Sequence, residues 1–348
     1  MPVVIEGGRV PRHLSRKAQV PASMSANGRK PQARPIRIAL INNMPDAALE
    51  DTEAQFFDLL DAASGDHSIS LKLFSLPKLP RKESGKHRLQ NFYFEIEDLL
   101  NDRFDGMIMT GTEPCQANLQ NEPYWPVLTE VLDWAERETT SSVLSCLAAH
   151  AGVLHSDGIS RHRLPDKQFG VFEYKIARNH NFTNGTGVTI EIPHSRWNEV
   201  RADDLRSSGY ELLTNSTNAG VDLFVKKKGR SLFLHFQGHP EYGMRTLLKE
   251  YRRDIKRFLR KERETYPTMP HKYFDAHAVR LLTEFQQSTV TKPAVTHLER
   301  FPEAEATRGI QGSWHGSAVI VYRNWFQYLA AQKVEIKAHS GMSHTVRG

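Results

Sequence analysis

The strongest constraint on the fold is an alternation of short β-branched runs and amphipathic segments between residues 35 and 146. The pattern predicts strands at 35–43, 68–76, 104–111 and 141–146. It predicts helices between them at 49–63, 92–100 and 124–138. Alternating strands and helices form a parallel sheet that helices cover on both faces. We therefore expect an α/β fold with a doubly wound, mostly parallel sheet flanked by helices.

The rest of the chain has a different residue pattern. Short β-rich segments are predicted at 169–176, 187–193, 210–216, 221–229 and 230–238. Helical patterns return at 244–262, at 274–287 and in the second half of 312–332. We expect one domain over residues 35–348, with a helical C-terminal annex at about 265–332. Residues 1–34 carry seven Lys or Arg against one acid and are rich in Pro, Ser and Gly, which predicts a mobile basic arm.

Composition excludes several classes of protein. No run reaches the roughly 18 apolar residues that a membrane helix needs. Two cysteines in 348 residues are too few for a disulfide framework, which favours the cytoplasm, and none has zinc-ligand spacing. The net charge of +6 accompanies no nucleic-acid-binding motif, so we expect no nucleic-acid partner. A mildly basic surface would suit an anionic substrate such as a coenzyme A ester.

Unusual residues follow three of the predicted strands. They are the segment 42–45 (NNMP), the pair Thr110-Gly111, and Cys146. In open parallel sheets, ligands bind beyond the carboxyl ends of the strands. The coincidence of three such ends is the first indication of a functional site.

Cys146 stands at a predicted strand-to-helix turn, in SSVLSCLAAHAG. A nucleophile there is exposed at the sheet edge, and the N-terminus of a helix stabilises a thiolate and an oxyanion. The usual elbow has glycine two residues to either side, whereas this one has Leu144 and Ala148. The local pattern alone leaves two alternatives open, a nucleophile and a buried core cysteine.

The segment 238–242 (GHPEY) follows another predicted strand. His239 precedes Pro240 and is therefore biased towards an extended conformation, in which residues i and i+2 face the same side. Glu241 can then orient the imidazole and stabilise its charged form, which is the arrangement of a base and its partner in a catalytic triad. A structural role for the pair is the alternative, and a cysteine elbow on the same sheet favours catalysis.

These motifs occur in a familiar order. GTEP (111–114), the Cys146 elbow and GHPEY together resemble the class I glutamine amidotransferase fold with its Cys-His-Glu triad. The chain resembles more closely the homoserine O-succinyltransferase family, which has this fold. The resemblance covers about residues 35–332, and the stretches that carry it include NNMP, FDGMIMTG (104–111), GVFEY (170–174), PHSRW (193–197), GHPEY, EYRRD (250–254) and SWHGSAVIVYRNWFQY (313–328).

The resemblance implies an acyl-CoA-dependent O-acyltransferase of methionine biosynthesis that works by a ping-pong mechanism. Cys146 would carry the acyl group, with His239 as base and Glu241 as its partner. Arg253 matches the arginine that binds the substrate carboxylate, and Lys167 and Ser195 match further substrate-binding positions. The oxyanion would be bound by the backbone N–H of Leu147 and by one from Asn43 or Gly111. The resemblance also implies acyl-CoA as co-substrate, no permanently bound cofactor, no metal, and a homodimer.

Two positions depart from the family pattern. Asp46 stands where family members usually carry lysine. Counting from Thr110-Gly111 places Cys115 at the acyl-selecting position, where glycine accompanies succinyl use and glutamate accompanies acetyl use. A small uncharged side chain at this position leaves room for a succinyl carboxylate and therefore favours succinyl-CoA as the donor. If the loop shifts by two residues, Glu113 takes the position instead, and acetyl-CoA is then favoured.

Four alternatives therefore remain beside a homoserine O-succinyltransferase. Two lie in the same class: acetyl-CoA as donor, and serine as acceptor. A third is a glutamine amidotransferase-like hydrolase that uses Cys146 on an amide. The last is a non-catalytic binding protein in which Cys146 is buried in the core.

Overall fold

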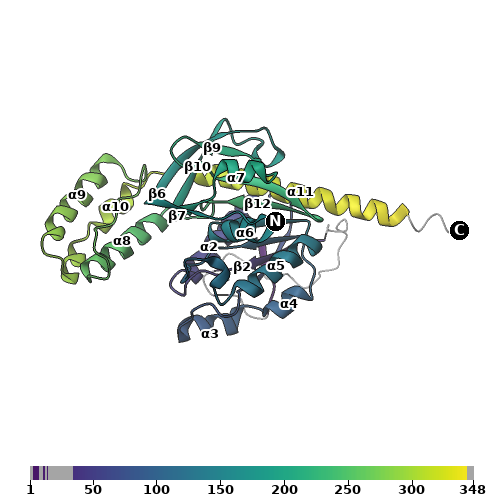
Figure 1. Cartoon of the computed structure of the whole chain (residues 1–348), viewed down its shortest axis with the longest axis horizontal. Helices are drawn as coiled ribbons and strands as arrows, with labels where there is room; N and C mark the ends of the chain where they lie inside the picture. The colour runs from purple at the N-terminus through teal and green to yellow at the C-terminus, as the bar shows by residue number, and fades with distance from the viewer. Residues whose placement is uncertain (1–2, 8–10, 12–13, 15–33, 343–348) are drawn as a thin grey trace, which may run out of the picture.

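A computed structural model of the chain describes residues 3–7, 11, 14 and 34–342, with side chains described as far as residue 334. Its main feature is an eight-stranded sheet in the order β1-β3-β2-β4-β5-β12-β11-β8 (Figure 1). The strands are β1 (Val3–Ile5), β2 (Ile36–Ile41), β3 (Ile69–Phe74), β4 (Gly106–Met109), β5 (Ser141–Ser145), β8 (Glu211–Leu212), β11 (Leu223–Lys228) and β12 (Ser231–Phe236). Every pair from β1 to β12 in this order is parallel, and β11 and β8 add antiparallel pairs at one edge.

Helices cover both faces of this sheet. Alternate residues of β2 show the two sides: Ile38 and Leu40 belong to one hydrophobic cluster, and Ala39 and Ile41 to another. The first cluster contains residues of α2 (Leu49–Ala63) and α11 (Trp314–Met342). The second contains residues of α4 (Ile96–Leu100), α5 (Trp125–Glu138) and α6 (Leu147–Asp157). The doubly wound α/β fold that the sequence predicts is thus confirmed.

A second, antiparallel sheet has the order β10-β9-β6-β7. Its strands are β6 (His162–Ile176), β7 (Thr189–Glu199), β9 (Thr214–Ser216) and β10 (Gly220–Val221). Strand β6 begins earlier than the predicted segment 169–176, in a stretch that contains Pro165. This early part pairs with β7 alone, and the register shifts between Arg163 and Gln168, so the proline is tolerated there.

The helices α8 (Thr246–Leu259), α9 (Ala276–Val290) and α10 (Glu303–Arg308), with the 3₁₀ helix η3 (Val295–Arg300), form a lobe at one end of the molecule (Figure 1). They share a hydrophobic cluster with Trp314, the first residue of α11. From there α11 runs back to the main sheet, where Trp325 is fully buried beside β2 and α2. The predicted annex is therefore not one separate helical unit, because α11 packs both in the lobe and in the core of the main sheet.

The N-terminal segment differs from the expected mobile arm where it is described. Val3–Ile5 form β1, which pairs in parallel with β3, and Val3 and Ile5 are buried. Three residues are too few for a strand pattern to stand out in a basic segment, so the sequence did not indicate this strand. Residues 15–33 of the predicted arm lie outside the described residues.

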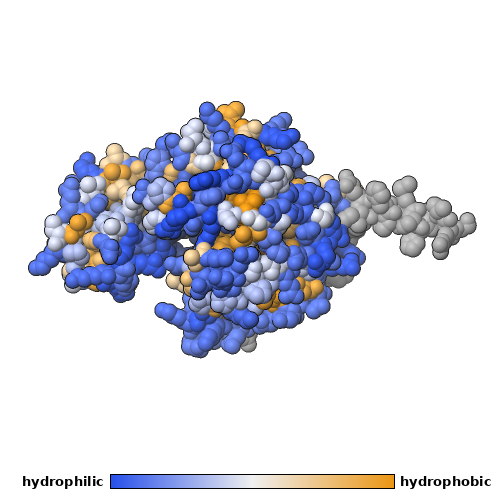
Figure 2. All heavy atoms as spheres, in the orientation of Figure 1, coloured by the Kyte–Doolittle hydropathy of each residue, from blue (hydrophilic) through white to orange (hydrophobic). Residues whose placement is uncertain are grey.

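Four short elements complete the described chain: α3 (Glu83–Phe92), α7 (Ala202–Ser207), η1 (Leu119–Asn121) and η2 (Asn181–Thr183). Helix α3 was not predicted, and the helix predicted at 92–100 is confined to α4, because Phe94 forms a β-bridge with Phe74. Figure 2 shows a face on which hydrophilic residues dominate and apolar residues lie in small separate groups. Among the described residues, no helix is both long enough and apolar enough to cross a membrane.

Candidate active site

Cys146 occupies a strained turn between β5 and α6. Its backbone has φ 55° and ψ −115°, a region that residues other than glycine seldom adopt and that costs about 1–3 kcal/mol. The amide of Cys146 donates to the carbonyl oxygen of Phe236 at 2.8 Å, which fixes the turn against the end of β12. Half-buried at the N-terminus of α6, Cys146 has the placement of a nucleophile elbow. A core cysteine would need none of this geometry.

His239 and Glu241 follow β12 and are both nearly buried. Nδ1 of His239 lies 2.9 Å from Oε1 of Glu241, so Nε2 is the ring nitrogen that remains for Cys146. Burial disfavours the imidazolium, but the charges of Cys146 and Glu241 and hydrogen bonds to both side chains raise the pKa of His239 well above its ordinary value. The three side chains therefore form one electrostatic unit that favours the charged form of the His239 imidazole.

Two neighbours hold this unit in place. The Ser145 hydroxyl donates to the Glu241 carboxylate, at 3.3 Å from Oε1 and 3.4 Å from Oε2. The ring of Tyr242 stacks on the imidazole of His239, with ring centroids 4.1 Å apart. These contacts restrict both His239 and Glu241 without adding charge.

Gly111 lies against the residue that follows Cys146. A Cβ atom at this position would lie 2.9 Å from the backbone nitrogen of Leu147, so a side chain would displace the turn. Among the described residues, no hydrogen-bond acceptor faces the N–H of Leu147 or Gly111, and both remain candidates for binding an oxyanion. The N–H of Asn43 differs, because it donates to Thr110 Oγ1 at 2.8 Å. Leu147 and Gly111 are therefore the pair that we retain.

A second group of side chains meets beside Cys146, His239 and Glu241, and we call it the acceptor cluster. Its members are Lys167, Ser195, Glu250, Arg253 and Asp254, which come from β6, β7 and α8. The Ser195 hydroxyl donates to Glu250 at 2.5 Å, and Lys167 Nζ lies 3.4 Å from Asp254 Oδ2. Arg253 Nε donates to Asp254 Oδ1 at 3.0 Å. The three substrate-binding residues predicted from the sequence are thus brought together.

The acceptor cluster combines charges of both signs. Burial alone would raise the pKa of Asp254, but Lys167 and Arg253 lower it below its ordinary value, so the carboxylate is ionised. Arg253 is 48% exposed and can bind a small anion without leaving its place on α8. Tyr242 joins the cluster to the triad, since its hydroxyl donates to Glu250 at 2.7 Å while its ring covers His239.

Most of the chain is similar in sequence to proteins of one known family. The family model described as homoserine O-succinyltransferase matches residues 2–336. The chain belongs to this family. It is 43% identical over 316 residues to a homoserine O-succinyltransferase from Rhodopseudomonas palustris, which covers 90% of this chain and 95% of that one. A second, from Bradyrhizobium japonicum, is 40% identical over 318 residues, covering 90% and 97%.

Two solved structures align with most of the chain at low sequence identity. A glutamine amidotransferase from Thermotoga maritima aligns with 84% of this chain and 98% of that chain, at 12% identity and a TM-score of 0.45. A glutamine amidotransferase from Methylobacillus flagellatus aligns with 85% and 95%, at 15% identity and a TM-score of 0.46.

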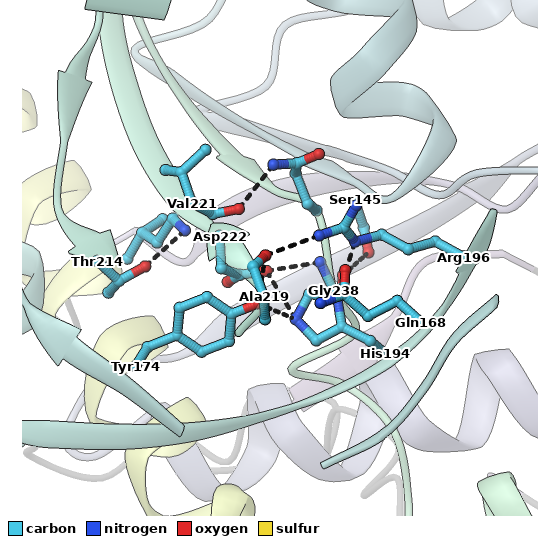
Figure 3. Close-up of polar contacts among 12 residues, drawn as sticks. Ser145, Gln168, Tyr174, His194, Arg196, Thr214, Ala219, Val221, Asp222 and Gly238 are labelled. Atoms are coloured by element: carbon cyan, nitrogen blue, oxygen red, sulfur yellow. Dashed lines mark hydrogen bonds and ion pairs between the residues drawn. The ribbon is translucent and has the colours of Figure 1, made fainter. Parts of the chain in front are cut away.

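Within this member of the homoserine O-succinyltransferase family, a buried polar network lies behind the GHPEY segment (Figure 3). The N–H of Gly238 donates to Oδ1 of Asp222 at 2.6 Å. His194 Nε2 lies 3.4 Å from the same oxygen and 2.8 Å from the hydroxyl of Tyr174. Arg196 donates to His194 Nδ1 at 3.1 Å, which requires a neutral ring, and burial lowers the pKa of His194 well below its ordinary value. Asp222 thus anchors the residue that precedes His239.

The two departures from the family pattern have different outcomes. Asp46 accepts a hydrogen bond from the N–H of Lys82 at 2.7 Å and pairs with Arg81 at 3.2 Å. It therefore fastens the loop after β2 to the start of α3 and has a structural role. Cys115 is exposed on the loop after β4, and nearby Glu113 pairs with Arg257 of α8 at 3.9 Å. The role of Cys115 in acyl selection stays a prediction.

Three residues of the site were missed from the sequence. Glu250 lies one helical turn before Arg253, so an i, i+3 pair on one face was the available signal. Tyr242 ends the GHPEY segment, and only its contacts with His239 and Glu250 reveal a role. Asp222 is the second residue of the predicted strand 221–229, where no pattern distinguishes a buried acid from an exposed one.

Proposed function

We propose that this chain transfers the succinyl group of succinyl-CoA to the hydroxyl of L-homoserine, through a thioester on Cys146. The observation that carries the proposal is the contact of Cys146, on its strained turn, with the buried His239–Glu241 pair. Membership of the homoserine O-succinyltransferase family supports the choice of substrates. We place the reaction in the cytoplasm, in methionine biosynthesis, with succinyl-CoA as a co-substrate that is not permanently bound.

In the first half-reaction the Cys146 thiolate attacks the carbonyl carbon of the thioester. The new C–S bond forms as the carbonyl π electrons move to oxygen, where the N–H groups of Leu147 and Gly111 stabilise the negative charge. Collapse of the tetrahedral intermediate breaks the bond to the CoA sulfur. The leaving thiolate takes the proton of His239, which leaves a succinyl-enzyme, free CoA and a neutral imidazole.

In the second half-reaction the neutral His239 accepts the proton of the homoserine hydroxyl while its oxygen attacks the succinyl thioester. Collapse expels the Cys146 thiolate and restores the charged pair with which the cycle began. The exchange of one thioester for another and then for an oxygen ester has no step with a large free-energy change. Positioning and charge stabilisation therefore account for the catalysis. Glu241 stabilises the imidazolium that forms in this step.

The acceptor cluster suits the zwitterionic end of homoserine. The planar guanidinium of Arg253 can bind the α-carboxylate through two parallel hydrogen bonds. The Glu250 carboxylate offers an acceptor for the α-ammonium. The Ser195 hydroxyl and Lys167 hold the Glu250 carboxylate in place. Because Tyr242 contacts both Glu250 and His239, an amino acid bound here would present its side-chain hydroxyl towards the base.

Release of CoA thiol, measured with purified protein, tests the proposed substrates. Succinyl-CoA and acetyl-CoA are each combined with homoserine and serine, and glutamine deamidation is measured in parallel. We expect the highest kcat/KM for succinyl-CoA with homoserine. Turnover of glutamine without CoA release would favour the hydrolase instead. A higher kcat/KM with acetyl-CoA would show that acetyl-CoA is the donor, and a higher kcat/KM with serine would show that serine is the acceptor. Family resemblance also leads us to propose a homodimer, which sedimentation equilibrium tests.

A further inference from the structure

A groove lined by cations runs along the side of α8 that faces η3 and α10. Its volume is about 310 Å³, within the roughly 300–1,000 Å³ that is usual for small-molecule sites. Leu298 of η3 and Glu303 of α10 form the wall opposite α8. We call it the basic groove, because five of its lining residues are cations of α8 and its N-cap: Arg245, Lys249, Arg252, Arg253 and Lys256.

The charges of α8 are sorted by side. Four of the cations recur every three or four residues and therefore lie along one stripe of the helix: Arg245, Lys249, Arg252 and Lys256. The acids Glu250 and Asp254 lie on another side, in the acceptor cluster. Like charges at this spacing destabilise a helix. An anionic ligand in the basic groove would relieve that repulsion.

The acid that lines the basic groove does not balance its cations. Among the described residues that line the groove, Glu303 is the one carboxylate. It is shared by two guanidinium groups, that of Arg252 at 3.3 Å and that of Arg245 at 3.5 Å. The groove therefore keeps an excess of positive charge after this pairing.

Two lysines carry that excess. Lys256 is exposed and forms no ion pair with any residue that the structure describes. Lys249 pairs at 2.6 Å with Asp51 of α2, a residue that does not line the groove. Both members of this pair are about half-exposed, and such surface pairs are worth only roughly 0–1 kcal/mol. A multiply charged anion can therefore compete with Asp51 for Lys249.

The basic groove is connected to the catalytic residues through Arg253. This residue lines the groove, and its Nη2 lies 3.5 Å from Oε2 of Glu250 in the acceptor cluster. The Glu250 carboxylate accepts a hydrogen bond from Tyr242, whose ring stacks on His239. A long ligand that is anchored in the groove can thus extend across the acceptor cluster to Cys146.

Resting on the proposed function, we propose that the basic groove binds the phosphate groups of succinyl-CoA, with Lys249 and Lys256 as the phosphate-binding cations. The two lysines lie two helical turns apart, about 10 Å along the axis, so they can contact separate phosphate groups of the nucleotide. The uncharged pantetheine arm would cross the acceptor cluster and bring the thioester to Cys146. Release of CoA then clears the acceptor cluster for homoserine, which fits the two half-reactions.

A donor without the nucleotide tests this assignment. Succinyl-pantetheine carries the same thioester and arm but no phosphate groups, and thiol release gives kcat/KM for both donors. Lys249→Gln and Lys256→Gln should each lower kcat/KM for succinyl-CoA about 5–10-fold, and the double variant about 50-fold, because charge-assisted hydrogen bonds to phosphate are lost. The values for succinyl-pantetheine should change less than about two-fold, since this donor makes no such bonds.

Arg280→Gln is the matched control. Arg280 is exposed on α9 of the same lobe and donates to His277 Nδ1 at 2.8 Å. Its replacement removes one positive charge outside the basic groove and should leave kcat/KM for both donors unchanged. Lys256→Arg should keep most of the activity with succinyl-CoA, because the positive charge remains.

Three outcomes would contradict the proposal. A wild-type protein that turns over neither donor would overturn the proposed function and this inference with it. Equal losses with both donors in the lysine variants would overturn only the inference. Adenosine 3′,5′-bisphosphate should inhibit the wild type competitively with succinyl-CoA and the double variant more weakly, and this result decides if succinyl-pantetheine is not a substrate. Inhibition that is not competitive with succinyl-CoA would instead make the groove a separate nucleotide site.

Discussion

The nucleophile region around Cys146 and the acceptor cluster on α8 are joined by Tyr242, yet different forces hold them. Backbone geometry holds the nucleophile region: the Cys146 turn is tied to Phe236, and the N–H of His239 donates to the Pro193 carbonyl oxygen at 2.9 Å. Side-chain ion pairs hold the acceptor cluster, in which Arg253 is half-exposed. We infer that the first region sets the rate of chemistry and the second sets affinity for the acceptor.

The largest effect is expected from removing the base in the nucleophile region. His239→Ala should lower kcat by about 10³–10⁴-fold, because neither proton transfer then has a positioned group. Stopped-flow detection of CoA thiol measures the loss. His155→Ala is a control, since this histidine lies on the exposed side of α6 and pairs with Asp133 at 2.7 Å. A loss below 10-fold in His239→Ala would contradict its role.

Asp222, behind the GHPEY segment, is expected to make folding pH-dependent. Burial raises the pKa of Asp222 from 3.8 to about 7, so the folded state holds this proton while the unfolded state has lost it. Stability should therefore fall as pH rises from about 4 to 7, by roughly 4 kcal/mol for this group.

Asp222→Asn removes that titration and keeps an acceptor for the N–H of Gly238. Urea unfolding at pH 5 and pH 8 measures the difference, and the variant should gain stability relative to wild type at the higher pH. If both proteins show the same change between the two pH values, the buried acid is not the cause.

In the acceptor cluster, Arg253→Gln should raise KM for homoserine about 10²-fold and leave the rate of Cys146 acylation nearly unchanged. Added salt should raise the wild-type KM as well, because a half-exposed guanidinium is screened. Arg252→Gln is the control, since Arg252 pairs with Glu303 at 3.3 Å outside the cluster. If Arg253→Gln slows Cys146 acylation as much as it slows transfer to homoserine, the acceptor cluster does not act on the acceptor alone, and the two regions do not have separate roles.

Ser145→Ala should have the smallest effect. The hydrogen bonds from Ser145 to Glu241 are long, at 3.3 and 3.4 Å, so roughly 1 kcal/mol is at stake. We expect kcat to fall about five-fold without a change in KM for homoserine. A change in the KM for homoserine alone would show that Ser145 acts with the acceptor cluster and not with the nucleophile region.

The sequence predicted the nucleophile region better than its surroundings, for a physical reason. Cys146, His239 and Glu241 are placed by local features, namely a strand-to-helix turn and an extended HPE segment, which residue order encodes. Glu250 and Asp222 act through contacts between distant elements, and no periodicity reports those. For Arg253, the charged run in α8 indicated only a solvated helix face, and the family resemblance supplied its role.

The same distinction applies to the fold. The central strands and α2 follow from strong periodic patterns, and α2 begins and ends where the sequence predicted. Strand β1 is too short to produce a pattern, and its pairing with β3 depends on contacts across more than sixty residues of chain. The division of α11 between lobe and sheet depends on where Trp314 and Trp325 are buried, which amphipathicity alone does not decide.

The most direct test of the central claim is the covalent intermediate itself. The protein is exposed briefly to succinyl-CoA without homoserine, and its intact mass is measured before and after homoserine is added. We predict one succinyl adduct that maps to Cys146, persists in Cys115→Ser, is absent in Cys146→Ser, and is discharged by homoserine. An adduct on Cys115 instead, or CoA release that requires homoserine and never passes through an acyl-enzyme, would contradict the account.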